Sequence, residues 1–220
     1  MVLSKRKSES AVKKRNLIAY TNPESIISEQ YRTIRTNLYF INGERKSNTL
    51  LITSPGKWEG KSTTASNIAV SMAQQKEKVL LIDGSLRNPS VHHIFKTANN
   101  TGLTDILTGK VSFEETVLSS EIGSLDILTS GTIPFNPAEL LASEMMKQLL
   151  QKVSSLYDII LIDSPPVLEV TDTKILANLS NGVVLVVRKD KTKMESAIES
   201  RKVLEYARSK IVGVILNEKS

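Results

Sequence analysis

The segment LLITSPGKWEGKSTTASNIAV, residues 50–70, joins an apolar run to a helical pattern through a short polar loop. Gly60, Lys61, Ser62 and Thr63 end the loop and open the helix, which is the setting that a phosphate-binding loop requires. Backbone N–H groups and the helix dipole at such a helix start attract an anion. Lys61 would reach the outer phosphates of a nucleotide, Ser62 would bind Mg²⁺, and Thr63 would hold another phosphate oxygen.

The first half of this loop departs from the standard spacing. A glycine is expected five residues before Gly60, where the chain has Pro55, and Gly56 follows one residue late. A Gly-Lys-Ser match on its own can arise by chance, so the assignment rests on the strand, loop and helix around it. We therefore assign Gly56, Lys57 and Glu59 to nucleotide binding together with Gly60 and the three residues after it.

Short apolar runs alternate with helical patterns along the rest of the chain. The apolar runs are continuous rather than alternating, which indicates strands that are buried on both faces. This order predicts an α/β fold, a three-layer doubly wound sheet that is mostly parallel, in one domain over residues 16–220. Strands are expected at 49–54, 78–83, 124–130, 157–163, 182–188 and 211–217, and helices at 24–41, 61–76, 137–155, 170–179 and 190–208.

Several of these strands end in polar residues. Ser54, Asp83, Asp163 and Asn217 each follow an apolar run, and ligands bind beyond the carboxyl ends of strands in such sheets. The two carboxylates are candidates for binding Mg²⁺ or a water attached to it. A helix-capping role is the alternative for Asp83, because aspartate is common at strand-to-helix junctions. Arg87 follows Asp83 in the next turn and is a candidate catalytic residue.

Composition narrows the function classes. The 220 residues include no cysteine and two histidines, which argues against disulfides, thiol catalysis and a histidine-rich metal site. Residues 1–15 hold six basic residues against Glu9 and account for +5 of the net charge of +6, so we expect a basic disordered arm. The arm either keeps the protein in solution or contacts an anionic membrane surface. Nucleic acid ranks below both, because no basic stripe with aromatics continues beyond it. No apolar run approaches about 20 residues, and no signal peptide opens the chain, so we expect a cytoplasmic protein.

The motifs together resemble one family over nearly the whole chain. The segments at 54–64, 79–90 and 158–166 are similar to the Walker A, A′ and B motifs of the bacterial tyrosine kinases of capsule and exopolysaccharide systems. SEQYRTIRTN at 28–37 resembles the E-x-x-R-x-x-R helix of that family, and the segments at 128–143 and 213–217 resemble its NPAELL loop and closing strand. These last three segments distinguish the family from partition and septum-site ATPases, which share the nucleotide motifs.

The resemblance implies an ATP-dependent protein-tyrosine kinase that binds ATP or ADP with Mg²⁺. Its catalytic residues would be Lys61, Asp83, Asp163 and Arg87, and Mg²⁺ would be held by Ser62, Asp83 and Asp163. Asn217 would border the adenine. The family implies a ring of subunits joined through Glu29, Arg32 and Arg35 of an oligomerisation helix over 24–41, although spacing alone favours an ordinary charged helix surface for these three. It also implies protein tyrosine substrates, and a membrane polysaccharide co-polymerase whose cytosolic tail recruits the kinase to the inner face of the plasma membrane and activates it.

The chain departs from the family pattern in three places. Lys57 and Trp58 stand where the family has Pro-Gly, and a glycine there allows positive φ. Ser85 stands where the second carboxylate of the A′ motif is usual, which would reduce turnover. The five tyrosines are scattered, so we expect a tyrosine-rich tail either to have been removed or never to have been present. These departures leave open a weakly active or inactive nucleotide-binding regulatory homologue, and a partition-type ATPase switch remains a third alternative.

Overall fold

The structure is a computed structural model that describes residues 17–42 and 48–218. The predicted basic arm at 1–15 lies outside the described residues. Among the described residues, no helix combines the length and the apolar character needed to cross a bilayer.

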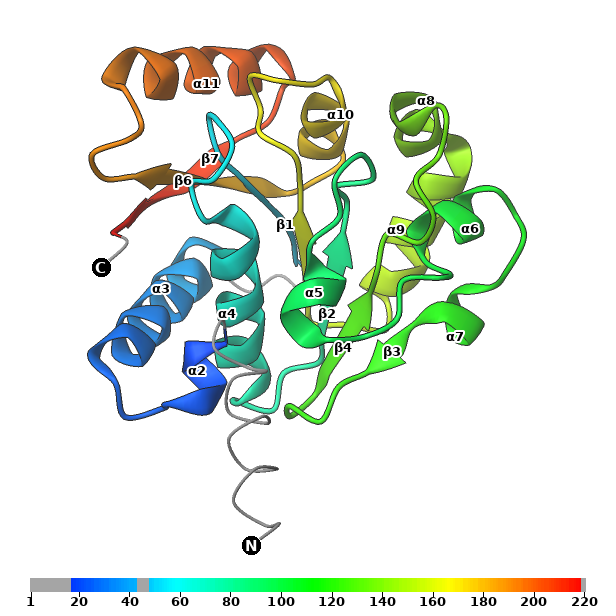
Figure 1. The fold of residues 1–220 in the computed structure, drawn as a ribbon, viewed down its shortest axis with the longest axis horizontal. Helices are drawn as coiled ribbons and strands as arrows, with labels where there is room; N and C mark the ends of the chain where they lie inside the picture. Colours follow the sequence, from blue (N-terminus) through cyan, green and yellow to red (C-terminus); the bar gives the residue numbers. More distant parts are fainter. Residues whose placement is uncertain (1–16, 43–47, 219–220) are drawn as a thin grey trace, which may run out of the picture.

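A seven-stranded sheet lies between two layers of helices (Figure 1). Its strand order is β3-β4-β2-β5-β1-β6-β7, and the pairings are parallel apart from the antiparallel pair of β3 with β4. The predicted three-layer, mostly parallel α/β fold is therefore confirmed. The strands are β1 (Asn48–Thr53), β2 (Val79–Asp83), β3 (Leu118–Ser119), β4 (Leu125–Leu128), β5 (Ile159–Asp163), β6 (Gly182–Arg188) and β7 (Ile211–Asn217).

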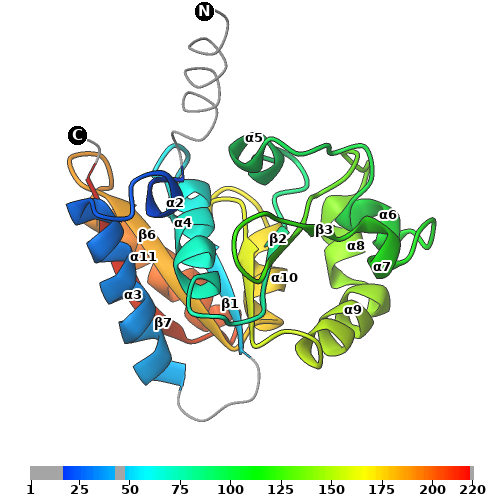
Figure 2. The same ribbon diagram turned by 90° about the horizontal axis from the view of Figure 1, so that it is seen from below.

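Helices cover both faces of the sheet, as Figures 1 and 2 show from two directions. The layer that holds α2, α3 and α4 packs on one face, and the layer that holds α8, α9, α10 and α11 packs on the other. The helices are α2 (Ile18–Thr21), α3 (Ile26–Asn42), α4 (Lys61–Ala73), α5 (Val91–Phe95), α6 (Leu103–Leu107), α7 (Phe113–Thr116), α8 (Pro137–Ala142), α9 (Glu144–Ser154), α10 (Asp172–Asn178) and α11 (Met194–Tyr206).

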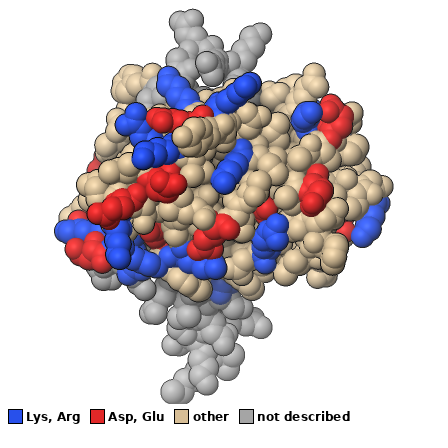
Figure 3. Space-filling model, turned by 90° about the horizontal axis from the view of Figure 1, so that it is seen from above, with Lys and Arg blue, Asp and Glu red and all other residues tan. Residues whose placement is uncertain are grey.

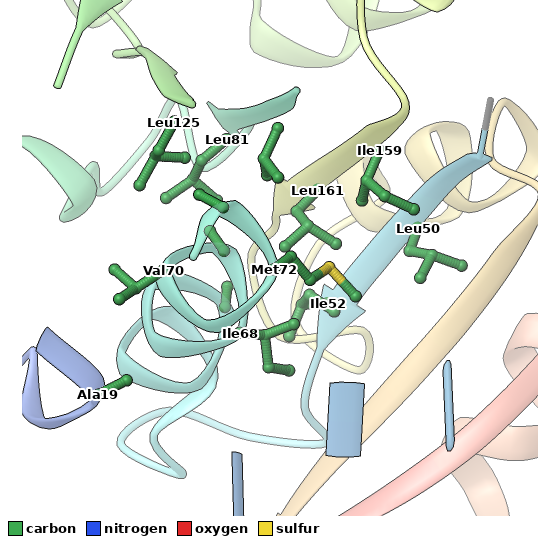
Figure 4. Close-up of a cluster of buried hydrophobic side chains, with 14 of the residues drawn as sticks. Ala19, Leu50, Ile52, Ile68, Val70, Met72, Leu81, Leu125, Ile159 and Leu161 are labelled. Atoms are coloured by element: carbon green, nitrogen blue, oxygen red, sulfur yellow. The ribbon is translucent and has the colours of Figure 1, made fainter. Parts of the chain in front are cut away.

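Two hydrophobic cores result, one on each face. Every residue of β2 and of β5 is buried, because apolar side chains on both faces of these central strands enter a core. In the first core, Ile68 and Met72 of α4 lie against Leu50, Ile52 and Leu161 of the sheet (Figure 4). The helix that follows the phosphate-binding loop is therefore fixed on the centre of the sheet.

The predicted helix over 137–155 is wrong in one respect, because the structure has two helices there. Ser143 lies between α8 and α9 with ψ of 159°, an extended conformation that ends the first helix. Its hydroxyl accepts a hydrogen bond from the Met146 N–H at 3.3 Å and so caps the second helix. The predicted strand at 124–130 is also too long, since β4 ends at Leu128.

Helical spacing places five apolar residues on one face of the predicted helix over 24–41, namely Ile27, Tyr31, Ile34, Leu38 and Ile41, and that face is only partly buried. Leu38 is in the first core, and Tyr31 and Ile34 pack against it at the edge. Ile27 instead remains 43% exposed. The side chain of Ile41, the fifth member of that face, lies outside the described residues. One side of α3 thus packs against the first core, and part of its apolar surface remains uncovered.

Candidate active site

The two candidate carboxylates lie side by side at the carboxyl edge of the sheet. Asp83 ends β2 and Asp163 ends β5, and these residues are partners in the parallel register of the two strands. On its other side, Asp163 is the register partner of Ile52 in β1. Because β1 leads directly into the loop before α4, the structure brings both carboxylates and that loop to one edge.

The start of α4 leaves its first N–H groups to a ligand. Gly60 precedes the helix with φ of +91° and has no side chain to cap it. A Cβ at this position would come within 2.1 Å of the Asn217 side-chain nitrogen, which itself donates a hydrogen bond to the Glu59 carbonyl at 2.9 Å. Glycine is therefore required at position 60 both by its φ and by the close approach of Asn217. The uncapped helix start is the feature that binds phosphate in such loops.

Glu59 holds the phosphate-binding loop in shape through buried hydrogen bonds. Glu59 as a whole is 4% exposed, and one oxygen of its carboxylate accepts the Gly56 N–H at 3.0 Å. Its other oxygen accepts the Thr192 hydroxyl at 2.6 Å. The Glu59 side chain thus closes the loop on itself and ties it to the turn after β6, so its contribution is to the shape of the loop.

The turn after β6 also holds the outer side of the loop. Arg188 donates to the Trp58 carbonyl at 3.1 Å, and Lys191 donates to the Lys57 carbonyl. The Lys57 ammonium pairs with Glu169 of the loop after β5 at 2.9 Å, and both side chains are partly exposed. Lys57 therefore extends toward the neighbouring loop and not toward the start of α4.

Trp58 adopts the backbone conformation that glycine would favour. Its φ is +64°, and its side chain is 80% exposed. A left-handed conformation costs roughly 1–2 kcal/mol in a residue with a Cβ. The loop thus adopts positive φ at this position even though the residue is tryptophan, and the indole projects from the loop into solvent.

Asp163 is buried without a hydrogen bond to either carboxylate oxygen within the described chain. Burial raises the pKa of Asp163, and the positive charge of Lys61 opposes that rise. The hydroxyls of Ser62 and Ser90 lie near enough to oppose it as well, although neither makes a hydrogen bond of normal geometry with the carboxylate. A buried carboxylate with both oxygens open is a costly arrangement unless a cation completes it.

Asp83 is buried too, but its oxygens are occupied. It accepts backbone N–H groups from Ser85 at 3.1 Å and from Ser90 and Val91 at 2.9 Å each. Burial raises the pKa of Asp83 to about 7, with the neighbouring Asp163 adding to the rise. Asp83 thus caps the start of α5, which is the alternative role that the sequence left open for it. Ser85 itself donates its hydroxyl to the Asn88 carbonyl at 3.1 Å.

The donor set at this edge fits Mg²⁺. The open carboxylate of Asp163 and the hydroxyl of Ser62 at the first turn of α4 are the hard oxygen donors that this ion prefers. Asp83 fits as a residue that binds a metal-bound water, since its own oxygens already accept three N–H groups. Among the described residues, no group of three or more histidine, aspartate or glutamate side chains is arranged to hold a metal ion.

The structure does not bring Arg87 to the open carboxylate. Its guanidinium makes a two-pronged ion pair with Asp172, at 2.9 Å from Nε to Oδ2 and 3.1 Å from Nη2 to Oδ1. Asp172 is fully buried at the start of α10, in the chain that follows Asp163. Arg87 therefore links the loop after β2 to the loop after β5, and its predicted catalytic role remains a prediction.

The three residues predicted at an oligomer contact make contacts within the chain. Glu29 and Arg32 pair with each other at 2.6 Å, on the exposed side of α3. Arg35 donates to the Ser71 carbonyl at 2.6 Å and thereby joins α3 to α4. Glu29 and Arg32 remain accessible to a neighbour, whereas Arg35 is partly committed to the helix that begins at the phosphate-binding loop.

A groove of about 1110 Å³ lies beside the start of α4. It is bounded by Tyr31 and Ile34 of α3, by Thr64 of α4, by the turn at 188–191 and by the end of β7 at 214–218, which includes Asn217. The groove is thus continuous with the side chain that contacts the phosphate-binding loop, and it is large enough for a base and a ribose.

The sequence pattern missed the residues that support this site. Asp172, Glu169 and Thr192 belong to this set, and each lies far along the chain from its partner. Only Asp172 carries a signal, because an acidic residue at the start of a predicted helix is a position to examine. The ion pairs form between residues on different loops that meet at the sheet edge. A local sequence pattern does not predict which loops meet there.

Comparison with known proteins identifies the family. The model of the AAA domain family matches residues 58–209. Tyrosine-protein kinase YwqD of Bacillus subtilis is 48% identical over 97% of this chain and 90% of its own length. Putative tyrosine-protein kinase CapB of Staphylococcus aureus is 37% identical over 92% of this chain and 89% of its own. The solved kinase domain of the Escherichia coli tyrosine kinase ETK is 34% identical, with a TM-score of 0.89 over 92% of this chain and 79% of that one. These relatives confirm the predicted family, and the chain belongs to the bacterial tyrosine-protein kinases.

Proposed function

We propose that this protein transfers the γ-phosphoryl group of ATP to protein tyrosine, and that the site at the carboxyl edge of the sheet performs the reaction. The observation that carries the proposal is the buried Asp163 carboxylate, whose two oxygens are open beside Lys61 and Ser62 at an uncapped helix start. Phosphoryl transfer depends mainly on positioning and charge neutralisation, and this arrangement supplies both.

Different residues of the site bind the phosphates, the base and Mg²⁺. The N–H groups at the start of α4 and the Lys61 ammonium hold the phosphates, while the base lies in the groove beside Asn217. Mg²⁺ held by Ser62 and Asp163, with Asp83 on its water shell, would neutralise charge on the phosphate oxygens when bound. Glu59 and Thr192 keep the loop in its binding shape before the nucleotide arrives.

The cellular role follows the family. We infer that the kinase acts in capsule or exopolysaccharide synthesis, that it forms a ring, and that the cytosolic tail of a membrane polysaccharide co-polymerase recruits it to the inner face of the membrane and activates it. The exposed pair of Glu29 and Arg32 supports a contact between subunits, because neither group is buried within the chain.

A regulatory homologue with little activity is the second candidate. Ser85 gives its hydroxyl to a backbone carbonyl and cannot act as a carboxylate, and Trp58 replaces the flexible glycine of the loop. Such a protein would bind nucleotide and assemble without forming phosphotyrosine.

The Lys61→Met variant tests the site. We expect it to lose ADP and ATP binding in calorimetry and to form no phosphotyrosine on a poly(Glu,Tyr) substrate with Mg²⁺ and labelled ATP. Lys202→Met is the matched control, because Lys202 is exposed on α11, and it should retain both. Unchanged nucleotide binding in Lys61→Met would remove Lys61 from the phosphate site. Nucleotide binding by the parent without phosphotyrosine at any protein concentration would favour the regulatory candidate.

A further inference from the structure

One tyrosine of this chain differs from the others in exposure. Tyr206 is 87% exposed, whereas the other four tyrosines are partly buried. Burial raises the pKa of Tyr31 and of Tyr39, and the hydroxyl of Tyr157 donates to Asp126 at 2.8 Å. Tyr20 packs against the first core. Of the five tyrosines, Tyr206 therefore presents the most accessible hydroxyl.

Tyr206 also lies where the backbone can adjust. It is the last residue of α11, and the chain leaves the helix through Arg208, which has φ of +56°. Helix ends open at a small fraction of the free energy of global unfolding. The hydroxyl of Tyr206 can therefore reach the active site of another molecule without loss of the core.

A groove lined by basic residues adjoins this tyrosine. The groove has a volume of about 630 Å³, lies between α9, α10 and α11, and has Tyr206 in its lining. Three cations line the same groove, namely Lys147, Lys174 and Arg208, while Ile175 and Val203 are among the apolar residues that line it. Figure 3 views the side of the molecule that carries α10 and α11, where basic side chains are separated by uncharged surface and by acidic groups.

Two of these cations lack a counter-ion within the described chain. Lys174 and Arg208 make no ion pair with any described carboxylate, while Lys147 pairs with Glu144 at 3.0 Å in an exposed position. A dianionic group at the Tyr206 hydroxyl would supply the missing charge, and its ring would contact the apolar lining. Arginine and lysine beside phosphate form the strong, charge-assisted class of hydrogen bond.

We propose that Tyr206 is a phosphoacceptor for a second copy of this kinase, and that the groove between α9, α10 and α11 holds the resulting phosphate. The inference rests on the proposed kinase activity. The phenolic oxygen of Tyr206 attacks the γ-phosphorus of ATP bound to the other copy and forms an O–P bond. The bond from that phosphorus to the β,γ-bridging oxygen breaks, ADP leaves, and the phenolic proton passes to water.

Two local charges oppose the phosphate and are weaker than the cations. The carbonyl end of α11 carries partial negative charge, which disfavours an anion there. Glu205 precedes the tyrosine, but its carboxylate is already paired with Arg201 at 2.7 Å. The two cations without a counter-ion in the described chain, Lys174 and Arg208, therefore face one helix end, and the balance favours the bound phosphate.

Site mapping tests the acceptor. The purified chain is incubated with Mg²⁺ and ATP, with poly(Glu,Tyr) in the same reaction, and phosphorylated peptides are located by mass spectrometry. We expect Tyr206 to carry most of the phosphate on the chain, and Tyr206→Phe to lose at least fivefold of that label while it phosphorylates poly(Glu,Tyr) at the parent rate. Tyr20→Phe is the matched control and should keep the label. Phosphate on the other tyrosines with Tyr206 unmodified would overturn the inference alone, whereas no phosphate on either substrate would overturn the kinase activity and the inference together.

Dephosphorylation tests the groove. The parent and a Lys174→Gln, Arg208→Gln variant are phosphorylated and then treated with an added tyrosine phosphatase. We expect the variant to lose the phosphate of Tyr206 at least threefold faster, because the groove no longer shields it. Lys193→Gln, at the opposite end of α11, should behave like the parent. Equal rates in all three proteins would show that the phosphate does not enter the groove.

Discussion

Asp163 is a buried carboxylate without a hydrogen bond from any described residue, next to a second buried carboxylate, Asp83. Burial and mutual repulsion raise the pKa of Asp83 from 3.8 to about 7, and burial raises that of Asp163. In the folded chain this pair therefore keeps a proton that the unfolded chain releases near pH 4. The free energy of unfolding contributed by the pair falls as pH rises from about 4 to about 7, since the unfolded state then binds fewer protons.

Asp163→Asn should therefore stabilise the free protein while it removes phosphoryl transfer. At pH 8, without Mg²⁺ or nucleotide, we expect the free energy of unfolding to rise by about 1–3 kcal/mol, because a buried charge without a partner is removed. At pH 4 the gain should shrink, since the pair is then protonated in the parent. Urea unfolding at the two pH values measures both.

Glu199→Gln is the control for this comparison, because Glu199 is exposed on α11, and its stability should match the parent at both pH values. A less stable Asp163→Asn at pH 8 would mean that Asp163 supports the fold, and that its open oxygens are not reserved for a cation.

Gly60 and Trp58 both have positive φ, but only Gly60 lacks room for a side chain. Gly60 has positive φ and no room for a Cβ, whereas Trp58 has positive φ and an exposed ring. The cost at Trp58 is confined to its backbone, at roughly 1–2 kcal/mol, because solvent accommodates the indole. At Gly60 a side chain would also displace Asn217, so substitution there would disturb the loop and the adjoining groove at once.

At the scale of elements, the phosphate-binding loop is held by two kinds of contact. The buried Glu59 carboxylate bonds to the Gly56 N–H and to Thr192, and the exposed Lys57 pairs with Glu169. Exposed ion pairs are worth about 0.2–1 kcal/mol, whereas a buried group that loses its partner costs about 1–3 kcal/mol. The buried contact should therefore determine the shape of the loop.

Glu59→Ala and Lys57→Ala separate these contacts. We expect Glu59→Ala to weaken ATP binding at least about tenfold, which corresponds to about 1.4 kcal/mol, because the Gly56 N–H and Thr192 lose their acceptor. Lys57→Ala should weaken binding less than about fivefold, in keeping with an exposed pair. Calorimetric titration with ATP at fixed Mg²⁺ compares the two variants. A larger loss of affinity in Lys57→Ala would mean that the exposed ion pair determines the shape of the loop.

The elements that the sequence predicted correctly are those with a strong local pattern. Continuous apolar runs gave β2 and β5, because both faces of these strands are buried. The short helices α5 and α6, of five residues each, have too few residues to show a helical period. At α7 a signal existed, since Ser112 and Glu115 form a capping box, with the Ser112 N–H donating to Glu115 at 2.8 Å.

The candidate site divides in the same way. Asp83 and Asp163 could be placed at one edge from the sequence, because carboxyl ends of parallel strands meet there. The partners of Arg87 and Lys57 could not, because Glu169 lies on the loop after β5 and Asp172 at the start of α10, and the path of that loop depends on packing. Sequence pattern thus located the charged groups, and the fold decided which of them stay open for a ligand.

At the scale of the whole molecule, large apolar side chains near the two ends of α3 are uncovered within the described chain, with polar residues between them. Ile26 and Phe40 are both 81% exposed. They lie 14 residues apart, about four turns at 3.6 residues per turn, and so share one side of the helix. Val214 and Leu216 of β7, the edge strand beside α3, are 61% and 60% exposed and border the groove assigned to the base. This surface supports the proposed ring, since a second copy would bury apolar area that the single chain leaves in water.

Ile26→Glu with Phe40→Glu tests that surface. We expect the doubly substituted protein to sediment as a monomer at concentrations where the parent forms rings, because each charge would have to enter the contact between subunits. Its free energy of unfolding, measured by thermal denaturation, should stay within about 0.5 kcal/mol of that of the parent monomer, since both side chains are exposed in the single chain. Met194→Glu, at a 71% exposed apolar residue of α11, is the matched control and should leave assembly unchanged. If the double variant still forms rings and Met194→Glu does not, the subunits meet through the opposite layer of helices.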